Sequence, residues 1–247
     1  MLEKTPYNIS LAVDTSSLVQ SIALMRGAAL LAERTLKTKT GHSGALLGAI
    51  DGMLQDLGLT LDDLDLLVIG AGPGSFTGLR IGLASLKSLS FARGIPLAAV
   101  SSLEAMARGA IASTGLLVAT SDARKGEVYA GLYRRFGQSL TLAEVVGDRT
   151  CSPSVLVELI AAHRGEDEPV ILLGTGPDRY SDLLTTLKAK GVDVIWLDAS
   201  FGVARASQLL AIARTKVTPT SLPPLDTLEP NYQRASEAEI NANKKRR

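Results

Sequence analysis

The sequence predicts an α/β protein of two related lobes, each with a mixed β-sheet covered by helices. Its apolar patterning gives three strands, a helix, a strand and a helix, and this order occurs twice along the chain. Such a repeat favours two duplicated lobes over one doubly wound sheet. With 247 residues and 46% hydrophobic content, the chain has enough apolar surface for a core in each lobe.

The first block of elements lies between residues 9 and 100. Short apolar runs bounded by turn residues predict its strands, and apolar residues three and four apart predict its helices. Gly58 and Gly94 follow the two helices at the place of a C-terminal glycine cap. In chain order we expect strands at 9–13, 21–25 and 28–36, a helix at 43–57, a strand at 66–69, a helix at 79–93 and a strand at 97–100.

The second block repeats this order between residues 116 and 216. We expect strands at 116–120, 127–133 and 140–146, a helix at 154–163, a strand at 170–173, a helix at 180–190, a strand at 194–197 and a helix at 205–216. The last helix either completes the second lobe or crosses back to the first. We therefore divide the chain into an N-terminal lobe (1–105), a C-terminal lobe (106–218) and an extended, proline-containing C-terminal segment with a basic tail (219–247).

Composition excludes several classes of function. With 26 basic and 25 acidic residues, the chain has no strong overall field for nucleic acid or an anionic membrane. No apolar run is long enough to span a membrane, and the charged N-terminus lacks the apolar core of a secretory signal, so we expect a cytoplasmic protein. Cys151, the one cysteine, is interpreted as a small core residue. His42 and His163, far apart in sequence, do not predict a zinc or iron site, whereas magnesium held by carboxylates stays open.

A glycine-rich segment, Gly70–Gly82, joins a predicted strand to a predicted helix. Four of its glycines lie between positions 70 and 78, which permits close backbone approach and an anion at the helix N-terminus. The segment has no lysine after Gly78, as a P-loop requires, and it contains neither GxGxxG nor GxSxG. Small residues spaced by four along the helix (Gly78 and Gly82; Ala84, Ser88 and Ala92) favour tight packing, within the lobe or against a partner, over ligand binding.

The helix expected at 43–57 has an apolar surface broader than one core contact needs. We predict that it packs, together with the following helix, against the equivalent helices of another subunit. The alternative is full burial inside the lobe. The residues assigned to this interface are His42, Leu46, Leu47, Ile50, Met53, Leu54, Arg80, Leu83 and Lys87.

Five sequence segments resemble the bacterial TsaB family. They are Asp14-Thr15-Ser16 after the first strand, His42-Ser43 before a helix, the block from Gly72 to Gly82, the run from Asp122 to Tyr129 and the C-terminal run from Glu229 to Arg234. The similarity spans residues 9 to 234, and the glycine block is much more specific than a generic glycine loop.

The resemblance implies an actin-like, two-lobed fold of the hexokinase and Hsp70 type. It also implies membership of the complex that transfers threonylcarbamoyl to adenosine 37 of tRNA, in which a paralogue, TsaD, is catalytic. That paralogue binds its metal through an HxExH-type segment. The aligned residues here are Ser102, Leu103, Glu104, Ala105 and Met106, so neither histidine is present.

Nucleotide binding is an open question for a chain of this fold class. Actin-like folds hold ATP with an Asp-x-Gly turn and a glycine-rich adenosine loop, which would correspond here to Asp14, Thr15 and Ser16 and to Gly174 and Gly176. The glycine of the first turn is missing. Asp14 and Asp122 could hold magnesium across a cleft, but the favoured alternative is that each caps its own turn.

The leading hypothesis is a non-catalytic scaffold subunit that needs no cofactor of its own, the metal being carried by the catalytic partner. The expected partners are a TsaD-type paralogue, a TsaE-type ATPase and, through the complex, tRNA. One alternative is an ATPase or kinase of actin-like fold that is active alone, with magnesium and nucleotide. Another is a homodimer that uses the same helical surface.

Overall fold

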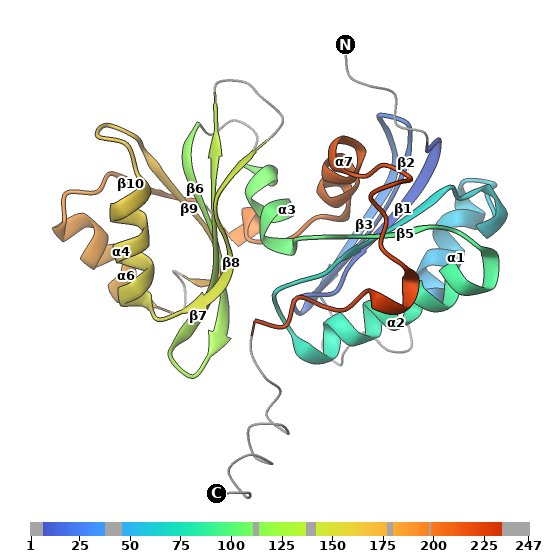
Figure 1. The fold of residues 1–247 in the computed structure, drawn as a ribbon, viewed down its shortest axis with the longest axis horizontal. Coiled ribbons are helices and arrows are strands. Elements are labelled where there is room, and N and C mark those ends of the chain that lie inside the picture. The colour runs from blue at the N-terminus through green and yellow to red at the C-terminus, as the bar shows by residue number, and fades with distance from the viewer. Residues whose placement is uncertain are drawn as a thin grey trace, which may run out of the picture.

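The computed structural model describes residues 7–37, 46–110, 114–136, 142–176, 180–197 and 199–233. It consists of two lobes, each built on a five-stranded sheet (Figure 1). The N-terminal sheet contains β1 (Ile9–Asp14), β2 (Val19–Arg26), β3 (Ala29–Lys37), β4 (Leu66–Gly70) and β5 (Leu97–Val100). The C-terminal sheet contains β6 (Gly115–Arg124), β7 (Glu127–Arg135), β8 (Ala143–Cys151), β9 (Val170–Gly174) and β10 (Val194–Trp196).

The two sheets have the same topology. Their strand orders are β3-β2-β1-β4-β5 and β8-β7-β6-β9-β10, with an antiparallel meander followed by two parallel strands in each. Ser10 of β1 lies opposite Leu66 of β4, and Leu116 of β6 lies opposite Val170 of β9. The duplicated mixed-sheet lobes predicted from the sequence are therefore confirmed.

Helices cover both faces of the N-terminal sheet. On the outer face lie α1 (Leu46–Asp56) and α2 (Phe76–Arg93), whose apolar residues form one core with the side chains of β1, β2, β4 and β5. On the inner face lies α7 (Ala206–Lys216), which buries Leu209, Leu210 and Ile212 against small residues such as Ala12 and Ala23. The small strand residues let this helix approach the sheet closely.

Helices cover the C-terminal sheet in the same way. Its outer face packs against α4 (Pro153–His163) and α6 (Ser181–Ala189), and its inner face packs against α3 (Ser102–Gly109) through Leu103 and Met106. Figure 1 shows α3 and α7 together between the two sheets. Each lobe therefore supplies the inner helix of the other.

This exchange corrects the predicted domain limits. The boundary between residues 105 and 106 falls inside α3, which packs mainly on the C-terminal sheet. Residues 206–216, assigned to the C-terminal lobe, pack on the N-terminal sheet, so the alternative that the last helix crosses back is confirmed. Both α3 and α7 are short and have apolar residues on more than one side. The sequence of each helix therefore does not specify which of the two sheets it covers.

The C-terminal segment packs along the N-terminal lobe before it reaches the lobe junction. Within the described ranges, short 3-10 helices lie at η1 (Leu61–Asp63), η2 (Ala199–Phe201) and η3 (Leu225–Thr227). After η3, Leu228 is buried in the same core as α1 and α2, and Leu225 packs against it. The predicted extended segment thus contributes Leu228 to the N-terminal core, whereas the basic tail lies outside the described residues.

Candidate functional site

The turn after β1 is a closed hydrogen-bonded unit. Asp14 is buried, and its Oδ1 accepts hydrogen bonds from the backbone N (2.9 Å) and the Oγ (2.7 Å) of Ser16. Its Oδ2 accepts a hydrogen bond from the Oγ of Ser102, the first residue of α3, at 2.6 Å. The carboxylate therefore caps its own turn, as the favoured alternative predicted, and also ties this turn to α3.

The glycine-rich segment is packed directly against this turn. A Cβ at Gly74 would lie 2.1 Å from the carbonyl oxygen of Ser16, and a Cβ at Gly78 would lie 2.1 Å from that of Thr15. A Cβ at Gly82 would lie 2.3 Å from Oγ1 of Thr15. Thr15 Oγ1 donates to the carbonyl of Gly78 at 2.8 Å, which adds a specific bond to the contact. The glycines thus serve close packing inside the lobe, and Thr15 and Ser16 fill the space before the N-terminus of α2.

The corresponding place in the C-terminal lobe is also filled. Gly174 has a φ of +101°, and a Cβ there would lie 1.7 Å from the carbonyl oxygen of Thr120; one at Gly176 would lie 2.5 Å from Oγ1 of Thr120. Strand register pairs Thr120 with Gly174, so the equivalent of Asp14 is Thr120. Asp122 lies two residues beyond Thr120, because β6 continues into its hairpin.

Asp122 belongs to that hairpin. Its Oδ1 accepts hydrogen bonds from the backbone N of Arg124 at 2.7 Å and from the hydroxyl of Tyr180 at 3.2 Å. A cavity of about 580 Å³ is lined here by Asp122, Arg124, Lys125, Gly126 and Tyr180. Across the residues that the structure describes, no group of three or more His, Cys, Asp or Glu side chains is arranged to hold a metal ion.

The predicted partner surface is divided by the structure into buried and exposed residues. Five of the assigned side chains lie in the core of the N-terminal lobe and are not surface residues of this chain: Leu46, Ile50, Met53, Leu54 and Leu83. For these, the alternative of full burial holds, because β-strands and the C-terminal Leu228 cover the stripe. Leu47 is 49% exposed, and Arg80 and Lys87 lie on the surface of α2. His42 lies outside the described residues.

One side of α2 is exposed along its whole length. We call it the α2 face; its residues, three or four apart, are Thr77, Arg80, Ala84, Ser88 and Phe91. Phe91 is 84% exposed, the most exposed of the large apolar side chains in the described ranges. Sequence reasoning missed Phe91, although its spacing from Ala84 and Ser88 was a signal for it. The two rows of small residues predicted on this helix therefore lie on different sides: Gly78 and Gly82 face the core, whereas Ala84 and Ser88 face solvent.

Residues 226–232 of the C-terminal segment contact side chains of helix α2, including Arg80 at one end of the α2 face. The guanidinium of Arg80 lies 4.0 Å from the centroid of the Phe76 ring, and its Nε donates to the hydroxyl of Tyr232 at 2.9 Å. The rings of Phe76 and Tyr232 are 5.0 Å apart. Lys87 donates to the backbone carbonyl of Asp226 at 3.4 Å. Arg80 is therefore held in place by stacking and a hydrogen bond.

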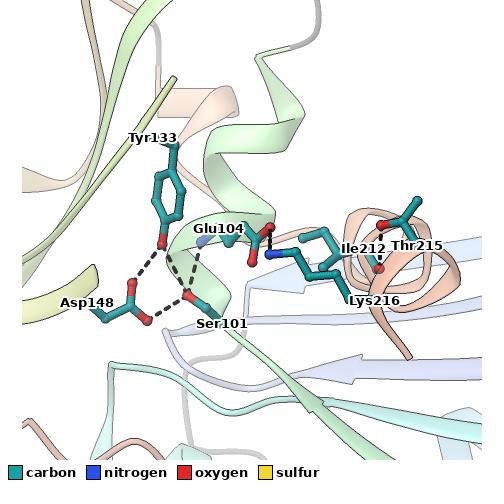
Figure 2. Close-up of polar contacts among 7 residues, drawn as sticks. All are labelled: Ser101, Glu104, Tyr133, Asp148, Ile212, Thr215 and Lys216. Atoms are coloured by element: carbon teal, nitrogen blue, oxygen red, sulfur yellow. Dashed lines mark hydrogen bonds and ion pairs between the residues drawn. The ribbon is translucent and has the colours of Figure 1, made fainter. Parts of the chain in front are cut away.

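The two lobes meet at a partly buried carboxylate, Asp148 of β8. Figure 2 shows its Oδ2 accepting from Ser101 Oγ and its Oδ1 from the hydroxyl of Tyr133, each at 2.7 Å. Asn231 Nδ2 donates to Oδ2 at 3.2 Å, and the Asn231 backbone N donates to the carbonyl of Ala71. This junction therefore joins β8, β7, the start of α3 and the C-terminal segment.

Burial raises the pKa of the Asp148 carboxyl; the charges of Glu144 and Glu104 act in the same direction, and the hydrogen bonds from Ser101 and Tyr133 oppose it. Because the folded pKa exceeds the ordinary value of 3.8, the stabilisation from this group is complete below that value and is lost as pH rises through the folded pKa.

An Asp148→Asn variant tests this pH dependence. At acid pH it is expected to be less stable by about 1 kcal/mol, because one hydrogen-bond acceptor is lost. The deficit is expected to shrink as pH rises towards 7, measured by urea unfolding from pH 4 to 8. A deficit that is constant or grows over this range contradicts the assignment. Asp51→Asn, on the exposed side of α1, controls for a general effect of charge removal.

Two lobes with the same sheet order, each with glycines packed against the end of its first strand, define a duplicated two-lobed α/β protein. Residues 30–195 match the family model of TsaD, described as tRNA N6-adenosine threonylcarbamoyltransferase. The tRNA threonylcarbamoyladenosine biosynthesis protein TsaB of Bacillus subtilis (strain 168) is 32% identical, covering 93% of this chain and 95% of its own length. TsaB of Escherichia coli (strain K12) is 30% identical, covering 91% and 94%. This chain belongs to the TsaB family.

A solved structure agrees with this relationship over nearly the whole chain. A Pseudomonas aeruginosa protein, described as uncharacterized with similarity to peptidase YEAZ, superposes with a TM-score of 0.79 at 27% identity, covering 92% of this chain and 100% of its own. Within the part of the chain that the structure describes, no helix is both long and apolar enough to cross a membrane.

Proposed function

We propose that this chain is the non-catalytic partner subunit of the complex that transfers threonylcarbamoyl to adenosine 37 of tRNA. Its place in the TsaB family supports a role in threonylcarbamoyladenosine biosynthesis, since relatives with that name cover most of the chain. The single observation that carries the non-catalytic assignment is the start of α3. There the residues aligned with the partner family's metal-binding segment have structural roles.

Two polar side chains at the start of α3 are already engaged in the fold. Ser102 Oγ donates to Asp14, and Glu104 forms an ion pair with Lys216 of α7 at 2.6 Å. Between them Leu103 is buried in the core under the C-terminal sheet, as is Met106 one turn on. Neither apolar side chain can act as an imidazole ligand. The same helix that would hold a catalytic metal in the paralogue serves here to connect the two lobes.

We further propose that the α2 face, together with Leu47 of α1, binds a TsaD-type paralogue. Ala84 and Ser88 at the centre of the face allow another helix to approach closely, and Phe91 supplies an apolar contact at one end. Arg80, fixed by Phe76 and Tyr232, supplies a charge at the other end. A TsaE-type ATPase would then join the pair, and tRNA would be bound through the complex, because the chain's net charge of +1 gives it little attraction of its own.

No cofactor is proposed for this chain. The glycines considered for a nucleotide, Gly174 and Gly176, are packed closely on Thr120, and the Asp14 carboxylate is engaged by Ser16 and Ser102. Magnesium at Asp14 would have to displace two hydrogen bonds from Ser16 and one from Ser102. The metal of the reaction is therefore assigned to the catalytic partner.

Reconstitution tests this proposal. The paralogue and its ATPase partner are expected to form threonylcarbamoyladenosine in tRNA at least about tenfold more slowly without this chain than with it, measured by nucleoside analysis of the tRNA. Equal rates with and without it would exclude the subunit role. A parallel calorimetric titration with ATP and magnesium is expected to give no binding heat. Heat that Asp14→Ala abolishes would instead favour an ATPase active alone.

A further inference from the structure

The C-terminal segment connects three parts of the molecule through a few consecutive residues. We call residues 225–233 the C-terminal strap; Figure 1 shows it, in red, passing along α2 towards the C-terminal sheet. Its first part is anchored in the core of the N-terminal lobe, where Leu228 is buried and Leu225 packs against the cluster. Its last three residues leave that core and contact both lobes.

One side of the strap is bonded to the lobe junction. The backbone N of Asn231 donates to the carbonyl of Ala71 in the glycine-rich segment at 2.8 Å, and its Nδ2 donates to Asp148 Oδ2 at 3.2 Å. Thr150 Oγ1 of β8 donates to the carbonyl of Gln233 at 3.3 Å. These contacts tie the end of the strap to the N-terminal lobe through Ala71 and to the C-terminal sheet through β8.

Tyr232, between Asn231 and Gln233, contacts α2 instead. Its hydroxyl accepts a hydrogen bond from Nε of Arg80 at 2.9 Å, and its ring centroid lies 5.0 Å from that of Phe76. The Arg80 guanidinium lies 4.0 Å from the centroid of the Phe76 ring. The position of this cation on the α2 face therefore depends on a residue whose two sequence neighbours are bonded to the lobe junction.

Neighbouring residues of the strap cannot shift independently, because consecutive Cα atoms are fixed about 3.8 Å apart. A movement of β8 that pulls on Asn231 and Gln233 therefore also displaces Tyr232. Hydrogen bonds weaken steeply with distance and misalignment, so a small displacement is enough to break the bond from Arg80 to Tyr232. With the strap detached, Arg80 keeps only its contact with Phe76.

We propose that the C-terminal strap couples the lobe junction to partner binding at the α2 face, with Asn231 and Tyr232 as positioning residues for Arg80. This inference rests on the proposed function, since it takes the α2 face as the surface for the TsaD-type paralogue. The partner binds the attached state more tightly, because Arg80 is already held there and loses less conformational freedom on binding. By linkage, a bound partner stabilises the contacts of the strap at the junction to the same extent.

Partner affinity of junction variants tests the coupling. Asn231→Ala and Thr150→Val each remove one hydrogen bond between the strap and β8, at half-buried residues outside the α2 face. Each is expected to weaken binding of the paralogue about three- to tenfold, measured by calorimetry on the full-length chain. Thr150→Val preserves the side-chain shape and serves alone if Asn231→Ala does not fold. Arg93→Gln, also on α2, is the control and should stay within about twofold of the wild type, because Asp62 already pairs with this cation.

A double-mutant cycle separates the coupling from a general effect on stability. Arg80→Gln removes the guanidinium that the strap positions, and it is expected to weaken partner binding at least about tenfold. In the Arg80→Gln background, Asn231→Ala and Thr150→Val are each expected to change the affinity less than twofold further. If they weaken binding equally in both backgrounds, Asn231 and Thr150 do not act through Arg80 and the coupling is wrong.

Hydrogen exchange of the chain alone tests the reverse direction without any partner. The Asn231 amide, bonded to the carbonyl of Ala71, reports whether the strap is attached. Arg80→Gln is expected to speed exchange of this amide at least about threefold, whereas Arg93→Gln should leave it as in the wild type. Unchanged exchange in Arg80→Gln would overturn the coupling.

Ala84→Glu, which places a charge at the centre of the α2 face, distinguishes failure of this inference from failure of the proposed function. If Ala84→Glu abolishes partner binding while Asn231→Ala and Thr150→Val bind as the wild type does, the α2 face is the partner surface and only the coupling is refuted. If Ala84→Glu binds the paralogue normally, the α2 face is not the partner surface, and the coupling to partner binding is rejected with it.

Discussion

The Gly78→Ala variant is expected to lose about 3 kcal/mol of unfolding free energy. In an exposed helix this change would stabilise by up to about 1 kcal/mol, because alanine is the better helix former. At position 78, however, the new Cβ would lie 2.1 Å from the carbonyl oxygen of Thr15, which is backbone and cannot rotate away. Either α2 or the turn after β1 must move, which also breaks the bond from Thr15 Oγ1 to Gly78.

Gly52→Ala is the matched control for this experiment. Gly52 lies inside α1, and nothing comes within 4 Å of a Cβ built on it. The same substitution is therefore expected to stabilise the protein by about 0.5–1 kcal/mol. Urea unfolding of both variants measures the difference. If Gly78→Ala is as stable as the wild type, the glycine block is not explained by the contact with Thr15.

An Ala84→Glu substitution is expected to have the largest effect on function. Ala84 is exposed at the centre of the α2 face, where a glutamate would hold a partner helix away and bury a charge. We expect loss of binding to the TsaD-type paralogue by about a hundredfold or more. In the reconstituted reaction, threonylcarbamoyladenosine formation should fall to the rate seen without this chain.

A control variant shows whether the loss of binding expected for Ala84→Glu is specific to the α2 face. Val155→Glu places the same charge at a 42% exposed apolar position on helix α4 of the C-terminal lobe, and it is expected to leave binding and activity unchanged. Urea unfolding of both variants confirms that they are folded. Full activity of Ala84→Glu would rule out the α2 face as the partner surface. Analytical ultracentrifugation of the chain alone reports whether the same substitution also disrupts a homodimer.

The sequence was sufficient for the order and duplication of the strands, because each lobe repeats a local pattern of runs and turns. It was not sufficient for the ends of β6 and β8, which run to Arg124 and Cys151, beyond the predicted limits of 120 and 146. It was not sufficient for α3 and α7, whose sheet is chosen by packing between lobes. The broad stripe on α1 was over-interpreted for a similar reason. The core that contains Ile50 and Leu54 also contains Leu228, which is far away in sequence and lies in a segment that was expected to be extended.

The candidate site was predicted in part. The sequence indicated that the glycine block serves packing, and the contacts of Gly78 and Gly82 with Thr15 agree with this. The favoured prediction that Asp14 and Asp122 each cap their own turn is confirmed by their hydrogen bonds with Ser16 and Arg124. The contacts of the C-terminal strap with α2 and β8 had no sequence signal, since they join elements that only the fold brings together.

The exchange of inner helices affects how the chain folds during synthesis. When residues 1–105 have left the ribosome, the inner face of the N-terminal sheet still lacks α7, which begins at Ala206, and its outer core still lacks Leu228. Apolar surface on Ala12, Ala23 and Val68 therefore stays in contact with water until the C-terminal lobe has been made. The chain is expected to fold after synthesis as one cooperative unit rather than lobe by lobe from its N-terminus.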